Sequence, residues 1–336
     1  MSFINSQIRI SGELISVANH YRKSLSSRIA LTTLVRGIRV LFRPFAQQRL
    51  NDIPSYREYV LGTPAALQHV SCKKYVFKGL SLDQRFERAC DHFKFENEFL
   101  SKQFLADVYG GKELVVWQEE VEGRTLSVII RACLAYMPEG NYRMSLCIDG
   151  KPVHNMSFSW FKDEDGGMVP FVARNQGLWK SEPEPLEWFE AMYPNNSPSY
   201  FCYAALQGIA QAIGARRVLA VKGIQQYCYD DEKAERVQRF VKTYDEFWKL
   251  FGGEEGTSGH FEIPVPFYLK PLSEVTPKHR KRSAMRRAHW ARIEEGVCSG
   301  LTQMFRQSPK PASAVVQAVP AVHVQDFSAE AALTAY

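Results

Sequence analysis

Apolar and polar residues alternate along the middle of the chain in a series of short runs, a pattern typical of β-strands with one buried face. Turn residues separate the runs, and the dipeptide Asp149-Gly150 favours a tight hairpin between two of them. The pattern therefore predicts an antiparallel meander. The predicted strands cover residues 113–121, 126–136, 142–148 and 153–161.

After the meander, the pattern changes to that of a parallel β-α-β unit. Met168–Arg174 is a predicted strand, Pro198–Ile213 a predicted buried helix, and Arg217–Val221 a continuously apolar second strand. Gly214 suits a left-handed cap at the end of the helix. The polar triplet Asn175-Gln176-Gly177 predicts a turn after the first strand. Because ligands of such units lie beside this turn and the start of the helix, we expect a cleft there.

A helix is predicted before the meander, because Ser81 and Gln84 have the spacing of a capping box. Apolar residues at helical spacing continue from there to about Val108. His92 lies on or beside the buried face of this helix. A histidine in such a place is more often a core residue with satisfied hydrogen bonds than a ligand, so a structural role is favoured and a site role is the alternative.

Three further elements follow the crossover. A second capping box, Thr243 with Glu246, predicts a helix over Tyr244–Phe251. Phe261–Tyr268 alternates like a strand, but its prolines place it at a sheet edge. Lys278–Arg292 is strongly basic and predicted to be helical. The whole pattern predicts an α+β fold: a mixed sheet of one antiparallel meander and one β-α-β crossover, with N-terminal helices and a C-terminal basic helix.

The N-terminal segment is basic and amphipathic. No acidic residue occurs within Leu14–Asn51, and apolar residues form a helical stripe that ends before Pro44. A basic amphipathic helix can lie on an anionic membrane, and Arg36, Arg39 and Arg43 are then the candidate lipid-binding residues. The alternative, which the sequence favours, is a helix that packs its stripe on the core of the protein and keeps its arginines in water.

The C-terminal basic helix has two possible uses. Lys281, Arg282, Arg286 and Arg287 can bind the phosphates of a lipid headgroup or of nucleic acid. Nucleic acid ranks below lipid, because no recognised nucleic-acid-binding module accompanies the basic residues. A solvated helix face with some arginines paired to acidic loops is an equally weighted alternative.

Composition divides the chain into three parts and bounds its class. With 336 residues, 45% hydrophobic residues, 23% charged residues and a net charge of +6, the chain has the composition of a soluble globular protein. Residues 307–336, rich in Pro, Ala, Val and Gln, are predicted to be disordered. The predicted parts are the basic region 1–50, one α+β domain 51–306 (helical part 51–110, sheet-containing part 111–270, basic helix 275–306) and the tail 307–336.

The seven cysteines are scattered and form no C-x-x-C pair, which indicates reduced thiols in a reducing compartment. We see no secretory signal and no run of about 18 apolar residues that could span a membrane. We therefore expect a cytoplasmic protein, with peripheral attachment to the inner membrane as an open alternative. No motif of a serine hydrolase, zinc protease, P-loop enzyme or metal site occurs, so catalytic residues stay unknown.

The predicted order of elements resembles the acyl-CoA N-acyltransferase (GNAT-type) architecture. In that family the turn after the first crossover strand binds a pyrophosphate, usually through R/Q-x-x-G-x-G/A. Here Arg174-Asn175-Gln176-Gly177 supplies one glycine where the pattern has two. The resemblance implies an acyl-CoA-type donor near Arg174, Asn175, Gln176, Gly177 and the helix-start residue Ser199. A tight turn that Gly177 permits is the structural alternative.

A second resemblance rests on segments that occur in order over residues 50 to 295: Lys78-Gly79-Leu80-Ser81-Leu82, Gln84-Arg85-Phe86, His92-Phe93, Tyr142-Arg143-Met144-Ser145-Leu146, Asn175-Gln176-Gly177, Tyr244-Asp245-Glu246-Phe247-Trp248, Gly252-Gly253, Lys281-Arg282-Ser283 and Arg286-Arg287. In order and spacing they resemble the bacterial VirK/YbjX family. The resemblance implies an accessory protein of envelope function, linked to virulence, placement of surface proteins, antimicrobial-peptide resistance and stress or DNA-damage responses. The implied partner is an anionic lipid surface or an envelope protein, and no metal is expected.

Overall fold

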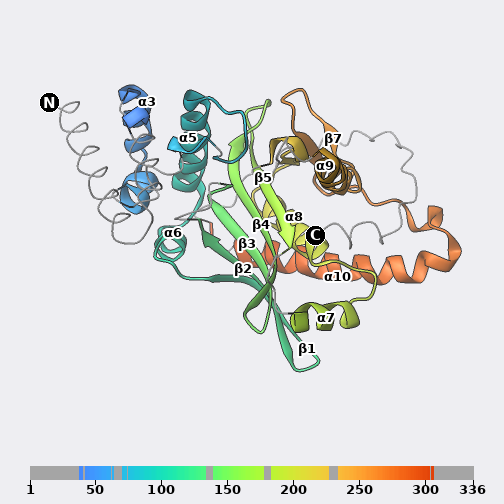
Figure 1. Cartoon of the computed structure of the whole chain (residues 1–336). Helices are drawn as coiled ribbons and strands as arrows, with labels where there is room; N and C mark the ends of the chain where they lie inside the picture. The colour runs from blue at the N-terminus through green and yellow to red at the C-terminus, as the bar shows by residue number, and fades with distance from the viewer. Residues whose placement is uncertain are drawn as a thin grey trace.

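The computed structural model in Figure 1 describes most of the chain between residues 38 and 305. The described residues are 38–40, 42–61, 63, 70–73, 75–133, 139–177, 183–226, 234–302 and 304–305. Arg36, the rest of the N-terminal segment before residue 38, and the predicted tail 307–336 lie outside them. The described elements form a mixed sheet with helices around it, which confirms the α+β class.

The sheet has eight strands in the order β1-β2-β3-β4-β5-β6-β8-β7. β1 to β5 form an antiparallel meander, β5 and β6 are parallel, and β8 pairs antiparallel with both β6 and β7. The predicted meander and parallel crossover are therefore confirmed. The strands are β1 (Leu114–Val121), β2 (Arg124–Ala132), β3 (Tyr142–Ile148), β4 (Lys151–Lys162), β5 (Met168–Gly177), β6 (Arg217–Ala220), β7 (Glu254–Glu255) and β8 (Phe261–Pro264).

The β3–β4 turn follows from local sequence. Asp149 and Gly150 both have positive φ angles, 51° and 74°, as the tight hairpin turn predicted for this dipeptide requires. The Oδ1 atom of Asp149 also accepts a hydrogen bond from the backbone N–H of Thr125 at 3.0 Å. This bond ties the turn to the start of β2 and helps to set the register of the meander.

Helices precede the sheet, fill the crossover and follow it. α7 and α8 lie between β5 and β6 in the chain, and α8 is the predicted crossover helix. The helices are α3 (Pro44–Asn51), the short π-helix η1 (Tyr56–Val60), α5 (Leu82–Phe99), α6 (Lys102–Tyr109), α7 (Pro183–Met192), α8 (Pro198–Ala212), the 3-10 helix η2 (Gly223–Gln225), α9 (Ala234–Lys249), the 3-10 helix η3 (Leu272–Glu274) and α10 (Pro277–Thr302).

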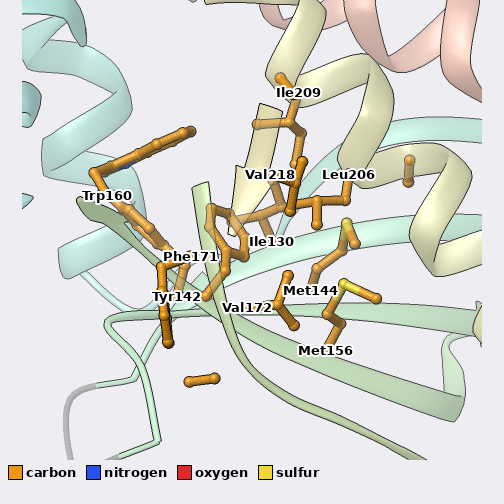
Figure 2. Packing of buried hydrophobic residues seen from close by; sticks show 14 of the residues in the cluster. Ile130, Tyr142, Met144, Met156, Trp160, Phe171, Val172, Leu206, Ile209 and Val218 are labelled. Carbon is orange, nitrogen blue, oxygen red and sulfur yellow. The ribbon is translucent and has the colours of Figure 1, made fainter. Parts of the chain in front are cut away.

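α8 is buried between the sheet and α10. It packs on β3, β4, β5 and β6, and in Figure 2 its Leu206 side chain lies between α8 and the strands that carry Met144 and Val172. On the other side of α8, a Cβ atom added at Gly208 would overlap the carbonyl oxygen of Glu294 in α10. The two helices therefore touch backbone to backbone at Gly208, which only glycine allows.

α5 completes the sheet where β3 ends. β3 reaches only as far as Phe158 of β4. Beyond that point, Nδ1 of His92 in α5 accepts a hydrogen bond from the backbone N–H of Trp160 at 3.2 Å. The Arg88 guanidinium donates to the backbone carbonyl of Lys162 at 3.3 Å. Two side chains of α5 thus satisfy backbone groups that a neighbouring strand would otherwise satisfy.

The predicted helix from Ser81 to Val108 is in fact two helices. Its capping box is confirmed, because the Gln84 N–H donates to Oγ of Ser81 at 3.2 Å and the Ser81 N–H donates to Oε1 of Gln84 at 2.9 Å. α5 then ends, and Ser101 caps α6 by accepting a hydrogen bond from the Phe104 N–H at 3.1 Å. This break allows α6 to contact β2.

Two further local predictions are wrong. Asn175-Gln176-Gly177 is the last part of β5 and not a turn, because the long β4 supplies pairing partners as far as His154. Thr243 and Glu246 do not start a helix, because α9 begins at Ala234 and contains both of them. In both cases the local residues suit the predicted turn or helix start, but pairing and packing with distant segments determine the observed structure.

Candidate functional site

The first candidate site is the point where β5 continues past β6. The parallel ladder ends with the pair Val172 and Ala220. The next carbonyl of β5, that of Ala173, accepts a hydrogen bond from the side chain of Gln226 at 2.6 Å instead of from a strand. β5 then runs on to Gly177 against β4. β5 and β6 thus separate at this end of the sheet, where a ligand of a β-α-β unit is expected.

Two of the predicted donor-binding residues are engaged within the protein. Arg174 forms an ion pair with Glu139, with Nη1 and Oε2 2.6 Å apart and the Glu139 side chain 5% exposed. Asn175 is buried, and its Oδ1 lies 2.7 Å from Nε2 of His154. Because an amide oxygen only accepts hydrogen bonds, Nε2 of His154 carries the proton. These contacts fix the end of β5 in place.

The other predicted donor-binding residues lie closer to solvent. Gln176 and Gly177 are partly exposed, and a Cβ atom added at Gly177 would meet no atom of the described residues within 4 Å. Ser199 lies in the first turn of α8, where its hydroxyl and that of the N-cap residue Ser197 are 2.8 Å apart. Among the described residues, the space beside Gly177 is therefore open, while the side chains of Arg174 and Asn175 are held by contacts within the protein.

Burial shifts the titration of His154. The imidazole is 5% exposed. Loss of hydration lowers its pKa to about 4; the hydrogen bond with Asn175 acts in the opposite direction, and the Arg174 charge lowers the pKa further. His154 is therefore neutral over the physiological pH range, and its protonation is coupled to the integrity of the β4–β5 pairing.

His92 belongs to a buried polar cluster that joins α5, α6 and β3. Its Nε2 lies 2.9 Å from Oε1 of Glu96, and both side chains are 0% exposed. The Tyr109 hydroxyl donates to the same oxygen at 2.7 Å, and the Tyr142 hydroxyl donates to it as well. Burial and the nearby carboxylate raise the pKa of both tyrosines well above the ordinary value. The geometry favours the structural interpretation of His92.

Sequence reasoning singled out His92 but missed its partners Glu96, Tyr109 and Tyr142. A signal for Glu96 was available, because residues four apart on a helix face each other. No local pattern relates the tyrosines of α6 and β3 to α5. The cluster is therefore a product of tertiary packing.

The second candidate site is the exposed side of α3 and of the helical residues just before it. Phe42 and Phe45 are 72% and 77% exposed, and Ile38 is 42% exposed. Val40 and Leu50, by contrast, are fully buried and hold this segment on the core. Exposed arginines lie among the apolar side chains. We call the following residues the α3 surface: Ile38, Arg39, Phe42, Arg43, Phe45 and Arg49.

A groove of about 320 Å³ separates α3 from α5. Phe86 and Cys90 line the α5 side, with Asp83 and Glu87 beside them. Arg43 reaches across, with its Nε 2.8 Å from Oδ1 of Asp83. The volume is at the lower end of the range for small-molecule pockets, roughly 300–1,000 Å³. The α3 surface therefore combines protruding apolar side chains, a groove and positive charge.

The predicted anion-binding arginines in the middle of α10 are part of the packing. The Arg286 guanidinium lies 5.2 Å from the ring centre of Tyr200 and 5.1 Å from that of Trp290, and burial lowers its pKa. Arg287 donates to the backbone carbonyl of Lys270 at 2.5 Å. The cation–π contact with Tyr200 joins α10 to α8, and the hydrogen bond of Arg287 joins α10 to the segment before it, so both arginines hold α10 in place.

Lys281 and Arg282 remain exposed near the start of α10. In Figure 1 this end of α10 lies at the opposite edge of the molecule from α3. The structure therefore does not bring the two predicted lipid-binding groups together: Arg39 and Arg43 are at one end, and Lys281 and Arg282 are at the other. Within the described part of the chain, no three His, Cys, Asp or Glu side chains are placed to hold a metal ion.

These features define an α+β protein built on a mixed eight-stranded sheet. Polar side chains contact one another where β5 and β6 separate, and the α3 surface carries exposed basic and aromatic side chains. A family described as "Protein of unknown function (DUF535)" matches residues 40–293. The chain belongs to this family, which is the VirK/YbjX family. No curated protein and no solved structure matches the chain. The matched range starts just before α3 and ends within α10.

A search of the described residues for membrane-spanning segments gives a negative result: their helices are too short or too polar to cross a bilayer.

We predict that His154 makes folding stability fall between pH 6.5 and pH 4. The unfolded chain takes up a proton near the ordinary imidazole pKa of 6.5, whereas the folded state does so only near pH 4. Lowering the pH from 7 to 5 should therefore cost about 2 kcal/mol at this residue, measured by urea unfolding. The His154→Gln variant should lose correspondingly less over the same interval. An equal pH dependence in both proteins would contradict the assignment.

Proposed function

We propose that this protein is a peripheral accessory of the bacterial envelope that docks on anionic lipid through the α3 surface. The observation that carries the proposal is the exposure of Phe42 and Phe45, 72% and 77%. Membership of the VirK/YbjX family supports the envelope role, which in that family extends to surface-protein placement and antimicrobial-peptide resistance. The α3 surface supplies a physical route by which such a protein reaches its membrane.

The composition of the α3 surface fits a lipid interface better than water. Complete burial of an exposed phenylalanine side chain stabilises a protein by roughly 1.5–3 kcal/mol. Phe42 and Phe45 lack most of this stabilisation in the free protein, because they are exposed to water. Interfacial helices use such side chains on the apolar side and basic residues at the headgroups. Each basic residue near an anionic surface adds about 1 kcal/mol. Two aromatic residues and three arginines together therefore support reversible docking.

The ion pair between Arg43 and Asp83 reduces the charge that Arg43 offers. Both side chains are well exposed, 46% and 61%, and exposed pairs are worth little in water. Arg39 and Arg49 have no carboxylate within 4 Å among the described residues. The positive charge of the α3 surface is therefore carried mainly by Arg39 and Arg49.

We predict that Phe42→Ser and Phe45→Ser each weaken binding to vesicles of phosphatidylcholine with phosphatidylglycerol by about tenfold, because each removes an apolar side chain that enters the lipid interface. The double variant Arg39→Gln/Arg49→Gln should weaken binding roughly 30-fold and remove most of its salt dependence. Sedimentation of the full chain with vesicles measures the partition coefficient.

The matched control is Ile224→Ser, which removes an apolar side chain of comparable exposure, 51%, from η2 instead of α3. It should bind as the wild type does. Wild-type binding that is equally strong on pure phosphatidylcholine, or that survives all four α3 substitutions, contradicts the proposal. Circular dichroism of each variant verifies that the exposed substitutions leave the fold intact.

A second function, transfer of an acyl group from an acyl-CoA-type donor, is favoured by the parting of β5 and β6. The resemblance to the GNAT-type architecture implies a donor at this point, and among the described residues no atom lies within 4 Å of a Cβ added at Gly177. Against this, Arg174 and Asn175 are held by Glu139 and His154. The donor would thus contact backbone groups and Gln176 more than these two side chains.

If this second function is correct, acyl-CoA at 100 times its dissociation constant should raise the melting temperature by at least about 3 °C, since a ligand bound only to the folded state stabilises it. Gly177→Val should abolish the shift by filling this space, yet leave the fold unchanged, because its Cβ meets no atom of the described residues and β-branched residues suit strands. No shift with any of several acyl chain lengths removes this option.

A further inference from the structure

The first turns of α10 concentrate positive charge at an unfavourable place. This helix has no acidic residue in its first turn, and the N-terminal end of a helix dipole is already positive. Cations there destabilise the helix unless an anion compensates them. The exposed residues that form what we call the α10 patch are Lys278, Arg280, Lys281, Arg282 and Met285.

The basic side chains of the α10 patch contact neutral groups. Arg280 donates to the backbone carbonyls of Val275 and Ser273 at 2.9 and 2.8 Å. Arg282 donates to Oδ1 of Asn195 at 3.2 Å. Among the residues that the structure describes, no carboxylate lies within 4 Å of any cation of the patch. The patch therefore keeps its full positive charge.

Several basic residues elsewhere in the described chain are paired with carboxylates, unlike those of the α10 patch. Arg217 of β6 is paired with three carboxylates, those of Asp163, Asp165 and Glu262. Arg292, further along α10 itself, pairs with Glu119 at 3.0 Å. Within α10 itself, the basic residues of the first turns thus lack the carboxylate that Arg292 has.

Apolar side chains accompany the charge. Met285 is 56% exposed within the patch, and Leu272 of η3, next to the start of α10, is 37% exposed. A nucleic acid buries an exposed Met only where the side chain reaches its bases, whereas a lipid interface offers anionic headgroups and apolar depth over its whole surface. The combination of charges and apolar side chains therefore favours anionic lipid.

The α10 patch lies far from the α3 surface. α10 has 26 residues, and a helix rises 1.5 Å per residue, so its ends are about 39 Å apart. Its C-terminal end is tied to the α5–α6 junction, where Leu100 pairs with Phe305 and the Ser101 N–H donates to the Met304 carbonyl at 3.2 Å. α3 packs on α5 as well, so the patch projects away from α3 (Figure 1).

From this arrangement we infer that the α10 patch is a second docking site for anionic lipid, and that the protein bridges two lipid surfaces. The inference rests on the proposed function, because the first surface is bound through α3. Two sites separated by several times the Debye length, about 8 Å at physiological salt, act independently. One surface is held by aromatic insertion at α3 and the other mainly by charge at α10.

The test uses the full chain and two vesicle populations of phosphatidylcholine with phosphatidylglycerol, labelled with a donor and an acceptor fluorophore. The wild type should bring the populations together, seen as energy transfer and turbidity. Lys278→Glu/Lys281→Glu should reduce this clustering at least tenfold while sedimentation with single vesicles stays within about twofold of the wild type. The control Lys112→Glu/Lys242→Glu has the same net charge change at other exposed positions, and it should cluster vesicles normally.

The possible results separate the two proposals. Wild-type protein that sediments with vesicles but clusters none at any protein-to-lipid ratio overturns the bridging inference and leaves docking through α3 intact. Undiminished clustering by Lys278→Glu/Lys281→Glu also overturns it, and solution mass measurements then show whether dimers are responsible. Loss of duplex DNA binding in this variant, with clustering unchanged, would assign the patch to nucleic acid. Absence of any sedimentation defeats the proposed function itself.

Discussion

The backbone contact between α8 and α10 at Gly208 is the constraint on which the rest of the arrangement depends. α8 lies directly on the sheet, and at Gly208 no side chain separates it from the α10 carbonyl of Glu294. α10 is therefore positioned against the sheet through α8, and it also contacts β1 directly. The contact of the Arg286 guanidinium with the Tyr200 ring of α8 then helps to fix its rotation. A long helix held in this way delivers its two ends to opposite edges of the molecule.

The same sheet also explains how polar groups are used inside the protein. Where β3 ends, His92 and Arg88 of α5 satisfy the backbone of β4. Where β6 ends, Gln226 satisfies the backbone of β5. All three side chains take the place of a missing strand, so these polar groups serve the structure of the sheet. The exposed basic and apolar groups on which the proposed lipid docking rests lie elsewhere, at α3 and at the start of α10.

The sequence predicted those features that short-range chemistry decides. Alternation identified the meander, Asp149-Gly150 its hairpin, and Ser81 with Gln84 the start of α5. The failures share one cause, which is that the outcome depended on a distant segment. The length of β4 turned Asn175–Gly177 into strand, and α9 extended through Thr243. The Glu96 cluster needed tyrosines from two other elements. Exposure is equally non-local: the pattern placed Phe42 in an apolar stripe, but only the folded core decides that Phe42 and Phe45 stay outside it.

In the proposed mode of action, the protein binds anionic lipid at the α3 surface and at the start of α10. Amide hydrogen exchange of the full chain, with and without vesicles that contain phosphatidylglycerol, tests it most directly because it reports where the protein is covered. The account predicts slower exchange in residues 38–51 and in the first turns of α10, and no change at the end of β5. Protection at the end of β5 without any change in residues 38–51 would contradict it.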